Sequence, residues 1–135
     1  MKYGYIGLGS LGGHLAMSLI KGGFDVTVFD LDAKLAERHV AAGGRLAKSI
    51  GELAQHVDHI FTCLPSPAIS EKVLDQILPH VRLGMTWIEN STLGRDEILR
   101  LAAKAEQAGL KVLEAPVTGG VHLAARGEIL SLIHI

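Results

Sequence analysis

The stretch KYGYIGLGSLG, residues 2–12, decides the fold of this chain. Its first part predicts a strand over residues 2–6, and the glycine turn leads into a helix expected over residues 11–21. A second strand, rich in β-branched residues, is expected over residues 25–29 and ends at Asp30. Strand, glycine turn, helix, strand and acid follow one another in the order of a dinucleotide-binding βαβ unit.

Each glycine of this turn has a physical role in such a unit. Gly7 allows a sharp turn out of the strand, Gly9 lets a pyrophosphate approach the backbone, and Gly12 lets the helix pack closely on the sheet. The N-terminus of the helix directs N–H groups and partial positive charge toward the phosphates. We therefore expect the whole turn to bind the cofactor: Gly7, Leu8, Gly9, Ser10, Leu11 and Gly12.

Asp30 predicts which dinucleotide is bound. A carboxylate at the tip of the second strand can accept hydrogen bonds from ribose hydroxyls, whereas a 2′-phosphate would meet a like charge. The sequence therefore predicts NAD as the cofactor in preference to NADP. The alternative is a glycine turn without a ligand, with Asp30 as a solvated strand end. Asp32 is the rival acid, but we expect it to cap a helix that begins at Ala33.

Composition excludes several classes of protein. The chain has 135 residues, 48% of them hydrophobic and 20% charged, which fits one globular domain. Its net charge of −1 indicates no basic surface for nucleic acid or for an anionic membrane. Cys63 is the one cysteine, so no internal disulfide forms and we expect a reducing, cytoplasmic location. No apolar run approaches the roughly 20 residues of a membrane span, and no histidine spacing is typical of a metal site.

Strands and helices alternate along the whole sequence. Further strands are expected over 45–47, 59–64, 86–89 and 111–114, and further helices over 31–42, 49–55, 70–78 and 96–108. Periodicity predicts that Leu35, Ala36 and Val40 form the inner face of the helix over 31–42. The alternation predicts an α/β fold of the Rossmann type, a doubly wound, mostly parallel sheet with helices on both faces.

Two strand tips carry residues that suit a ligand site. Leu64 ends the apolar strand expected over 59–64, and Pro65 follows it. These two residues either contact the cofactor or simply turn the chain into the next helix. Ser91 and Thr92 follow the strand over 86–89, and their hydroxyls either bind a ligand or cap the helix that comes next.

A third strand tip ends in Thr118, Gly119 and Gly120. Exposed backbone N–H groups of adjacent glycines form a concave anion site, which suits a substrate carboxylate. The alternative is a loop that only needs positive φ angles.

Four blocks of this sequence resemble those of one known family: residues 6–12, 26–30, 89–92 and 114–120. In this order they resemble the NAD-binding domain of the β-hydroxyacid dehydrogenases, most of all the 3-hydroxyisobutyrate dehydrogenase type. Four positions depart from that pattern. Leu11 replaces the usual Met, Glu89 and Glu114 open blocks that begin with Asp in the family, and Thr118 replaces Ser.

The resemblance implies roles for these residues. It places the glycine turn on the cofactor, Leu64 and Pro65 along it, and Ser91 and Thr92 near the nicotinamide. The block Thr118, Gly119 and Gly120 would hold the carboxylate of a small 3-hydroxy acid or semialdehyde. The implied reaction is reversible hydride transfer between a 3-hydroxy acid and NAD⁺.

The resemblance also sets expectations for domain organisation. The family's catalytic lysine lies beyond the end of this sequence, so we expect no catalytic residue in the chain. We expect an NAD(P)-binding domain over residues 1–130, an atypical tail over 131–135 and no C-terminal all-helical domain. Such a truncated chain should bind cofactor with little turnover. Two alternatives stay open, a non-catalytic dinucleotide-sensing module and a reductase of tartronate, succinic or glyoxylate semialdehyde type. Association into a homo-oligomer also stays open.

Overall fold

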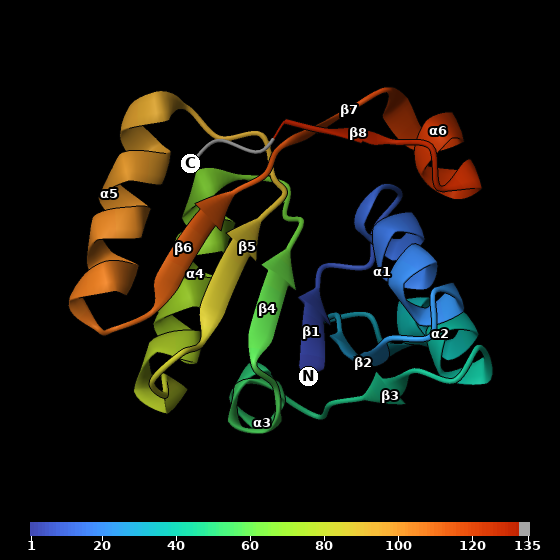
Figure 1. The fold of residues 1–135 in the computed structure, drawn as a ribbon, viewed down its shortest axis with the longest axis horizontal. Coiled ribbons are helices and arrows are strands. Elements are labelled where there is room, and N and C mark those ends of the chain that lie inside the picture. The colour runs from blue at the N-terminus through green and yellow to red at the C-terminus, as the bar shows by residue number, and fades with distance from the viewer. Residues whose placement is uncertain (133–135) are drawn as a thin grey trace.

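A computed structural model describes residues 1–132 of the chain, and its centre is a six-stranded parallel sheet (Figure 1). The strands are β1 (Lys2–Ile6), β2 (Asp25–Phe29), β3 (Arg45–Leu46), β4 (His59–Thr62), β5 (Thr86–Glu89) and β6 (Lys111–Glu114). Their spatial order is β3-β2-β1-β4-β5-β6. The chain thus moves outward from β1 to β3 and then crosses to β4, so the strand order reverses between β1 and β4. In open parallel sheets, ligands bind outside the carboxyl ends of the strands at this point.

Helices pack against both faces of the sheet, as predicted. The helices are α1 (Gly12–Lys21), α2 (Glu37–Ala41), α3 (Ile50–His56), α4 (Pro67–Ile77), α5 (Arg95–Gln107) and α6 (Gly120–Arg126), with 3-10 turns at Ala33–Ala36 and Leu78–His80. One core cluster joins α1 to β1 and β2 through residues such as Ala16, Tyr5 and Val28. A larger cluster joins α3, α4 and α5 to the other face, around Trp87. The Rossmann-type architecture is confirmed.

A second, smaller sheet follows β6. Strands β7 (Val117–Thr118) and β8 (Leu130–Ser131) pair antiparallel, with α6 between them. Helix α6 lies beside α1 (Figure 1). The tail expected over 131–135 therefore begins within a paired strand, and residues 133–135 lie outside the described part of the chain.

The helix expected over 31–42 is wrong in its length and in its inner face. A 3-10 turn precedes the short α2, because the Asp32 carboxylate accepts a hydrogen bond from the Lys34 backbone N–H at 3.1 Å and caps the turn. Leu35 and Val40 are 38% and 44% exposed. The change of helix type rotates the buried face away from these two residues.

His39 takes the place expected for an apolar side chain. Its ring is fully buried, with Nε2 2.8 Å from the carbonyl oxygen of Gly13 and Nδ1 2.9 Å from that of Leu35. Both partners are acceptors, so the one N–H of a neutral imidazole donates to one of these two carbonyls, which reduces the penalty of burying the ring. Ala36 is the other buried residue of this face.

The loop between β4 and α4 begins and ends earlier in the sequence than expected. Strand β4 ends at Thr62, so Leu64 and Pro65 lie in the loop. Helix α4 begins at Pro67, because proline suits the first helical position and the Ser66 hydroxyl caps the helix by accepting from the Ile69 N–H at 3.3 Å.

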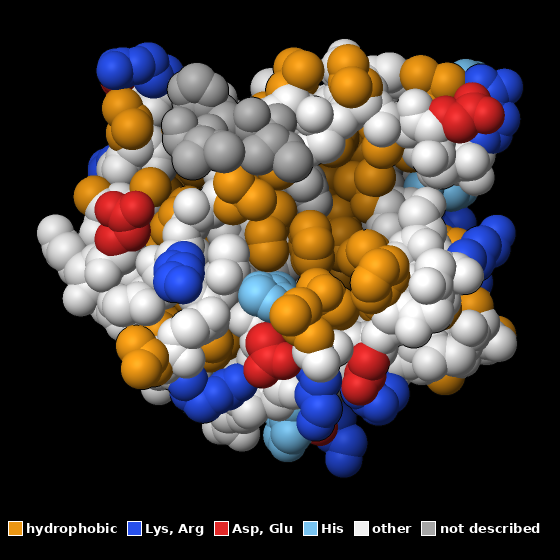
Figure 2. Space-filling model, in the orientation of Figure 1, with side chains coloured by type: hydrophobic (Ala, Val, Ile, Leu, Met, Phe, Trp, Pro, Cys, Tyr) orange, Lys and Arg blue, Asp and Glu red, His pale blue; other side chains and the backbone are white. Residues whose placement is uncertain are grey.

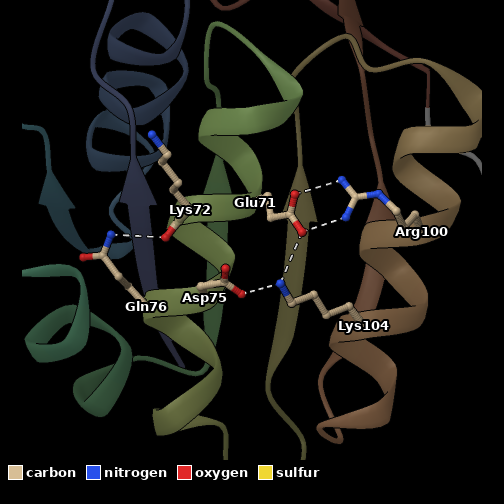
Figure 3. Close-up of polar contacts among 6 residues, drawn as sticks. All are labelled: Glu71, Lys72, Asp75, Gln76, Arg100 and Lys104. Carbon is tan, nitrogen blue, oxygen red and sulfur yellow. Dashed lines mark hydrogen bonds and ion pairs between the residues drawn. The ribbon is translucent and has the colours of Figure 1, made fainter.

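Helix α4 is fixed to α5 by ion pairs (Figure 3). The Glu71 carboxylate accepts two hydrogen bonds from the Arg100 guanidinium, at 2.6 and 2.9 Å. Lys104 adds contacts to Glu71 at 3.3 Å and to Asp75 at 2.5 Å. The hydrogen bonds from Arg100, and next those from Lys104, lower the pKa of Glu71 to about 2. Lys72 points away from this network (Figure 3).

Part of one sheet face has no helix over it among the described residues. On the side of α1, strands β5 and β6 are open (Figure 1), and apolar side chains gather in the middle of this face (Figure 2). Phe61 and Leu113 on this face are half-buried. This apolar surface is compatible with self-association, which stays a prediction. Within residues 1–132, no helix has the length and apolarity to cross a membrane.

Candidate functional site

A cavity of about 870 Å³ opens where the strand order reverses. It lies at the carboxyl ends of β1, β2, β4 and β5, which point to the upper edge of Figure 1. From the glycine turn it is lined by Gly7, Gly9, Ser10, Leu11 and Gly12. From the other strand tips it is lined by Asp30, Leu64, Pro65, Ser91 and Thr92. The structure therefore brings residues from four separate segments, all singled out in the sequence, into one crevice.

The three glycines of the turn have different surroundings. Gly7 has φ of +95°, and a Cβ there would lie 2.3 Å from the Cys63 carbonyl oxygen. A Cβ on Gly12 would lie 2.1 Å from the Gly7 carbonyl oxygen. A Cβ on Gly9 would meet no atom within 4 Å. Gly7 and Gly12 are thus required by the fold itself, whereas Gly9 leaves space that faces the cavity.

Asp30 connects the tip of β2 to the glycine turn. One carboxylate oxygen accepts a hydrogen bond from the Leu8 N–H at 2.7 Å, and the other accepts from the Asp32 N–H at 2.9 Å. Each oxygen keeps a further lone pair for a ribose hydroxyl. Leu8 itself is 1% exposed and packs into the core, so its backbone, and not its side chain, belongs to the site. The expectation that Asp32 is a helix cap is confirmed.

The opposite wall is held by a chain of hydrogen bonds. The Leu64 N–H donates to the Ser91 hydroxyl oxygen at 2.7 Å. The Ser91 hydroxyl and backbone N–H both donate to one carboxylate oxygen of Glu89, at 2.5 and 2.8 Å. Glu89 is fully buried, and burial raises its pKa, although the hydrogen bonds from Ser91 oppose this shift. The sequence marked Ser91 as a ligand residue but assigned no role to Glu89.

Helix α4 supplies a wall that the sequence analysis missed. Its contribution to the cavity consists of Ile69, Lys72, Val73 and Gln76. These four residues recur at the spacing of one helical face. That spacing was the available signal, but the sequence could not show which element this face meets. Lys72 places the only ammonium group of the described lining residues at the cavity.

Cys63 also lines the cavity but is not activated. It is half-buried, and burial, with the nearby Glu89 charge as the second cause, raises the pKa of its thiol to about 11. The neutral thiol is a poor nucleophile. Cys63 follows the last residue of β4, and we assign it no chemical role in the site.

The predicted substrate residues lie apart from the cavity lining. Thr118 ends β7, and Gly119 and Gly120 have φ of +111° and +74° before α6. Both glycines therefore have the positive φ that the alternative, a loop without a ligand, requires. Their role toward a carboxylate stays a prediction.

This geometry agrees with comparisons to known proteins. Residues 2–133 match the sequence family described as the NAD binding domain of 6-phosphogluconate dehydrogenase. The chain belongs to this family. The predicted oxidoreductase family and NAD-binding fold are thereby confirmed. The open side of Gly9 fits a pyrophosphate at the backbone.

Several curated relatives of this NAD-binding domain are named as dehydrogenases. Mitochondrial 3-hydroxyisobutyrate dehydrogenase of Rattus norvegicus is 33% identical over 133 residues, which are 96% of this chain and 40% of the relative. NAD-dependent L-serine dehydrogenase of Pseudomonas aeruginosa is 33% identical over 132 residues, 96% of this chain and 44% of the relative. The chain therefore spans less than half the length of these relatives.

The solved structures support the same resemblance. The Mycobacterium tuberculosis 3-hydroxyisobutyrate dehydrogenase, solved with L-serine, superposes with a TM-score of 0.93 at 27% identity. The superposition covers 98% of this chain and 45% of that protein. The similarity to 3-hydroxyisobutyrate dehydrogenases predicted from four sequence blocks is thus confirmed over nearly the whole chain.

Proposed function

We propose that this chain binds NAD in the crevice and serves as the cofactor-binding part of a dehydrogenase of small 3-hydroxy acids. One observation carries the proposal: a Cβ on Gly9 would meet no protein atom within 4 Å, and Gly9 lines the same cavity as Gly12, at the N-terminus of α1, and Asp30. A pyrophosphate needs close backbone approach, and a ribose needs an acceptor, at these two places.

Each wall of the crevice has a role in this proposal. Residues Gly7 to Gly12 bind the pyrophosphate, and Asp30 accepts from the adenosine ribose. Leu64 and Pro65 pack along the dinucleotide, while Ser91 and Thr92 lie near the nicotinamide.

The proposed reaction is reversible hydride transfer between a 3-hydroxy acid and NAD⁺. Bound NAD⁺ would supply the hydride acceptor. Thr118, Gly119 and Gly120 would hold the substrate carboxylate. Among the described lining residues the only lysine is Lys72, on the α4 wall. We assign no proton transfer to Lys72, so no general acid–base group is proposed in this cavity. We therefore expect little turnover by the 135-residue chain, since general acid–base catalysis is worth roughly 10²–10⁴-fold.

A second candidate is a non-catalytic domain that senses dinucleotides. The position of residues 118–120 outside the cavity lining favours it, since a sensor needs no substrate site beside the nicotinamide. Fold alone does not separate these functions. Addition of 3-hydroxyisobutyrate or L-serine distinguishes them, because only a dehydrogenase site should bind these acids more tightly when NAD⁺ is present.

The proposal is tested by Gly9→Val and isothermal titration with NADH. Valine at this position meets no protein atom close to its Cβ but occupies the space of the pyrophosphate. We expect an unchanged circular dichroism spectrum and a loss of NADH binding. A folded variant that binds NADH like the original chain would place the dinucleotide elsewhere.

A further inference from the structure

Glu89 is an unusual residue for the end of a central strand. It ends β5 between β4 and β6, and it is 0% exposed. No lysine or arginine donates a hydrogen bond to it among the described residues, and the donors to its Oε1 are the hydroxyl and backbone N–H of Ser91. A buried carboxyl group with hydroxyl and amide partners alone is costly to the fold.

The other oxygen of this carboxyl group adds to that cost. Within residues 1–132, Glu89 Oε2 and the buried hydroxyl of Ser70 have no partner in hydrogen-bonding geometry. Ser70 Oγ is nevertheless close enough to the carboxyl group to lower the pKa of Glu89. Buried polar groups without partners are rare in proteins and concentrate where function requires them. Stability alone therefore does not explain Glu89.

The hydrogen bonds of Ser91 show the structural role of Glu89. A hydroxyl group has one proton, and at Ser91 this proton is donated to Glu89. The hydroxyl oxygen is thereby oriented to accept the Leu64 N–H at 2.7 Å. The carboxyl group thus fixes the orientation of a hydroxyl that connects the loop after β4 with the loop after β5. Leu64 and Ser91 both line the cavity, whereas Glu89 does not.

We propose that Glu89 is a positioning residue of the cofactor site, which acts through Ser91 to hold the Leu64–Pro65 loop against the nicotinamide half of the dinucleotide. The inference rests on the proposed function. In the proposed function the adenosine and pyrophosphate half binds at the glycine turn and Asp30. Within residues 1–132, neither of these has a hydrogen bond to Leu64, Ser91 or Glu89. Glu89 therefore affects one half of the cofactor and not the other.

The test compares NADH with ADP, which lacks the nicotinamide riboside, by calorimetric titration of Glu89→Ala. We expect NADH binding to weaken about tenfold, as for the loss of one or two hydrogen bonds, and ADP binding to stay within about twofold. Glu89→Gln keeps an acceptor oxygen for Ser91 and should restore NADH binding. Exchange of the Leu64 amide proton should be faster in Glu89→Ala and close to the original rate in Glu89→Gln.

Glu114→Ala is the matched control. Glu114 lies directly beside Glu89 in the register of β6 and is half-buried, but it does not line the cavity. We expect this variant to bind both ligands unchanged. Glu89→Leu keeps most of the side-chain volume but removes both acceptor oxygens, and it repeats the test if Glu89→Ala does not fold.

Two results would overturn the inference. Equal weakening of NADH and ADP would mean that Glu89 supports the fold as a whole, and unchanged binding of both would mean that the connection has no role. If the unaltered chain binds neither ligand, the proposed function fails instead, so the two failures are distinguishable.

Discussion

Alanine at position 12 would place a methyl group inside the backbone of the glycine turn. Its Cβ would lie 2.1 Å from the Gly7 carbonyl oxygen and 3.0 Å from the Cβ of Cys63. A relaxed contact between such atoms is about 3.5 Å, so α1 must move away from β1 by roughly 1.4 Å. Both neighbours belong to packed backbone or to a strand end, and neither can move aside alone.

The magnitude follows from two opposing effects. Overpacking of this kind costs about 1–3 kcal/mol, and contact with backbone favours the upper end. Replacing a glycine inside a helix by alanine stabilises the folded state by roughly 0.5–1 kcal/mol. We therefore expect the free energy of unfolding to fall by about 2 kcal/mol for Gly12→Ala. For a domain of this size that lowers Tm by roughly 8 °C.

Urea unfolding followed by the fluorescence of Trp87, which is fully buried, measures this change. Gly9→Ala is the control, since its Cβ meets no atom within 4 Å. Its stability should stay within about 0.5 kcal/mol of the original, while its affinity for NADH falls. If Gly12→Ala is as stable as Gly9→Ala, the close contact between α1 and β1 is not what the glycine provides.

Three further predictions concern charged and titrating groups. Asp30→Ala should weaken NADH binding and narrow the difference between NADH and NADPH; calorimetric titrations that find the same difference would show that Asp30 does not accept from the ribose. Glu71 has a pKa of about 2 against its usual 4.5, so its ion pairs stabilise the fold above pH 4.5 and lose this effect as the pH falls toward 2. The stability advantage over Glu71→Gln in thermal melts should therefore vanish across that range, and an advantage that persists at pH 2 would contradict the assignment. The thiol of Cys63 has a pKa of about 11, so iodoacetamide should alkylate it more slowly at neutral pH than free cysteine, and faster reaction would mean that the thiol is activated.

The glycine turn and Asp30 could be predicted because their chemistry is local. A strand, a turn and a helix follow directly in the chain, and each glycine has a role that its neighbours define. The same reasoning left Ser91 open between a ligand site and a helix cap, and only the family resemblance implied a place near the nicotinamide. It assigned no role to Glu89, whose importance depends on Leu64 in another loop.

Positions that depend on distant contacts were not predictable. Lys72 and Gln76 line the cavity because α4 packs beside the switch point, and their sequence spacing marks only a helical face. His39 is buried because a carbonyl of α1 lies 2.8 Å from its ring. Periodicity favoured Leu35 and Val40 there, since a hydrophobic pattern contains no information on a partner 26 residues away.

Dinucleotide binding is tested most directly by a side-by-side titration of this chain with NADH and NADPH, followed by nicotinamide fluorescence. We expect both to bind in one crevice, with NADH tighter because of the Asp30 carboxylate. Tighter binding of NADPH would contradict the role of Asp30. Binding of neither by a chain whose circular dichroism shows it to be folded would contradict the central claim that the glycine turn holds a dinucleotide.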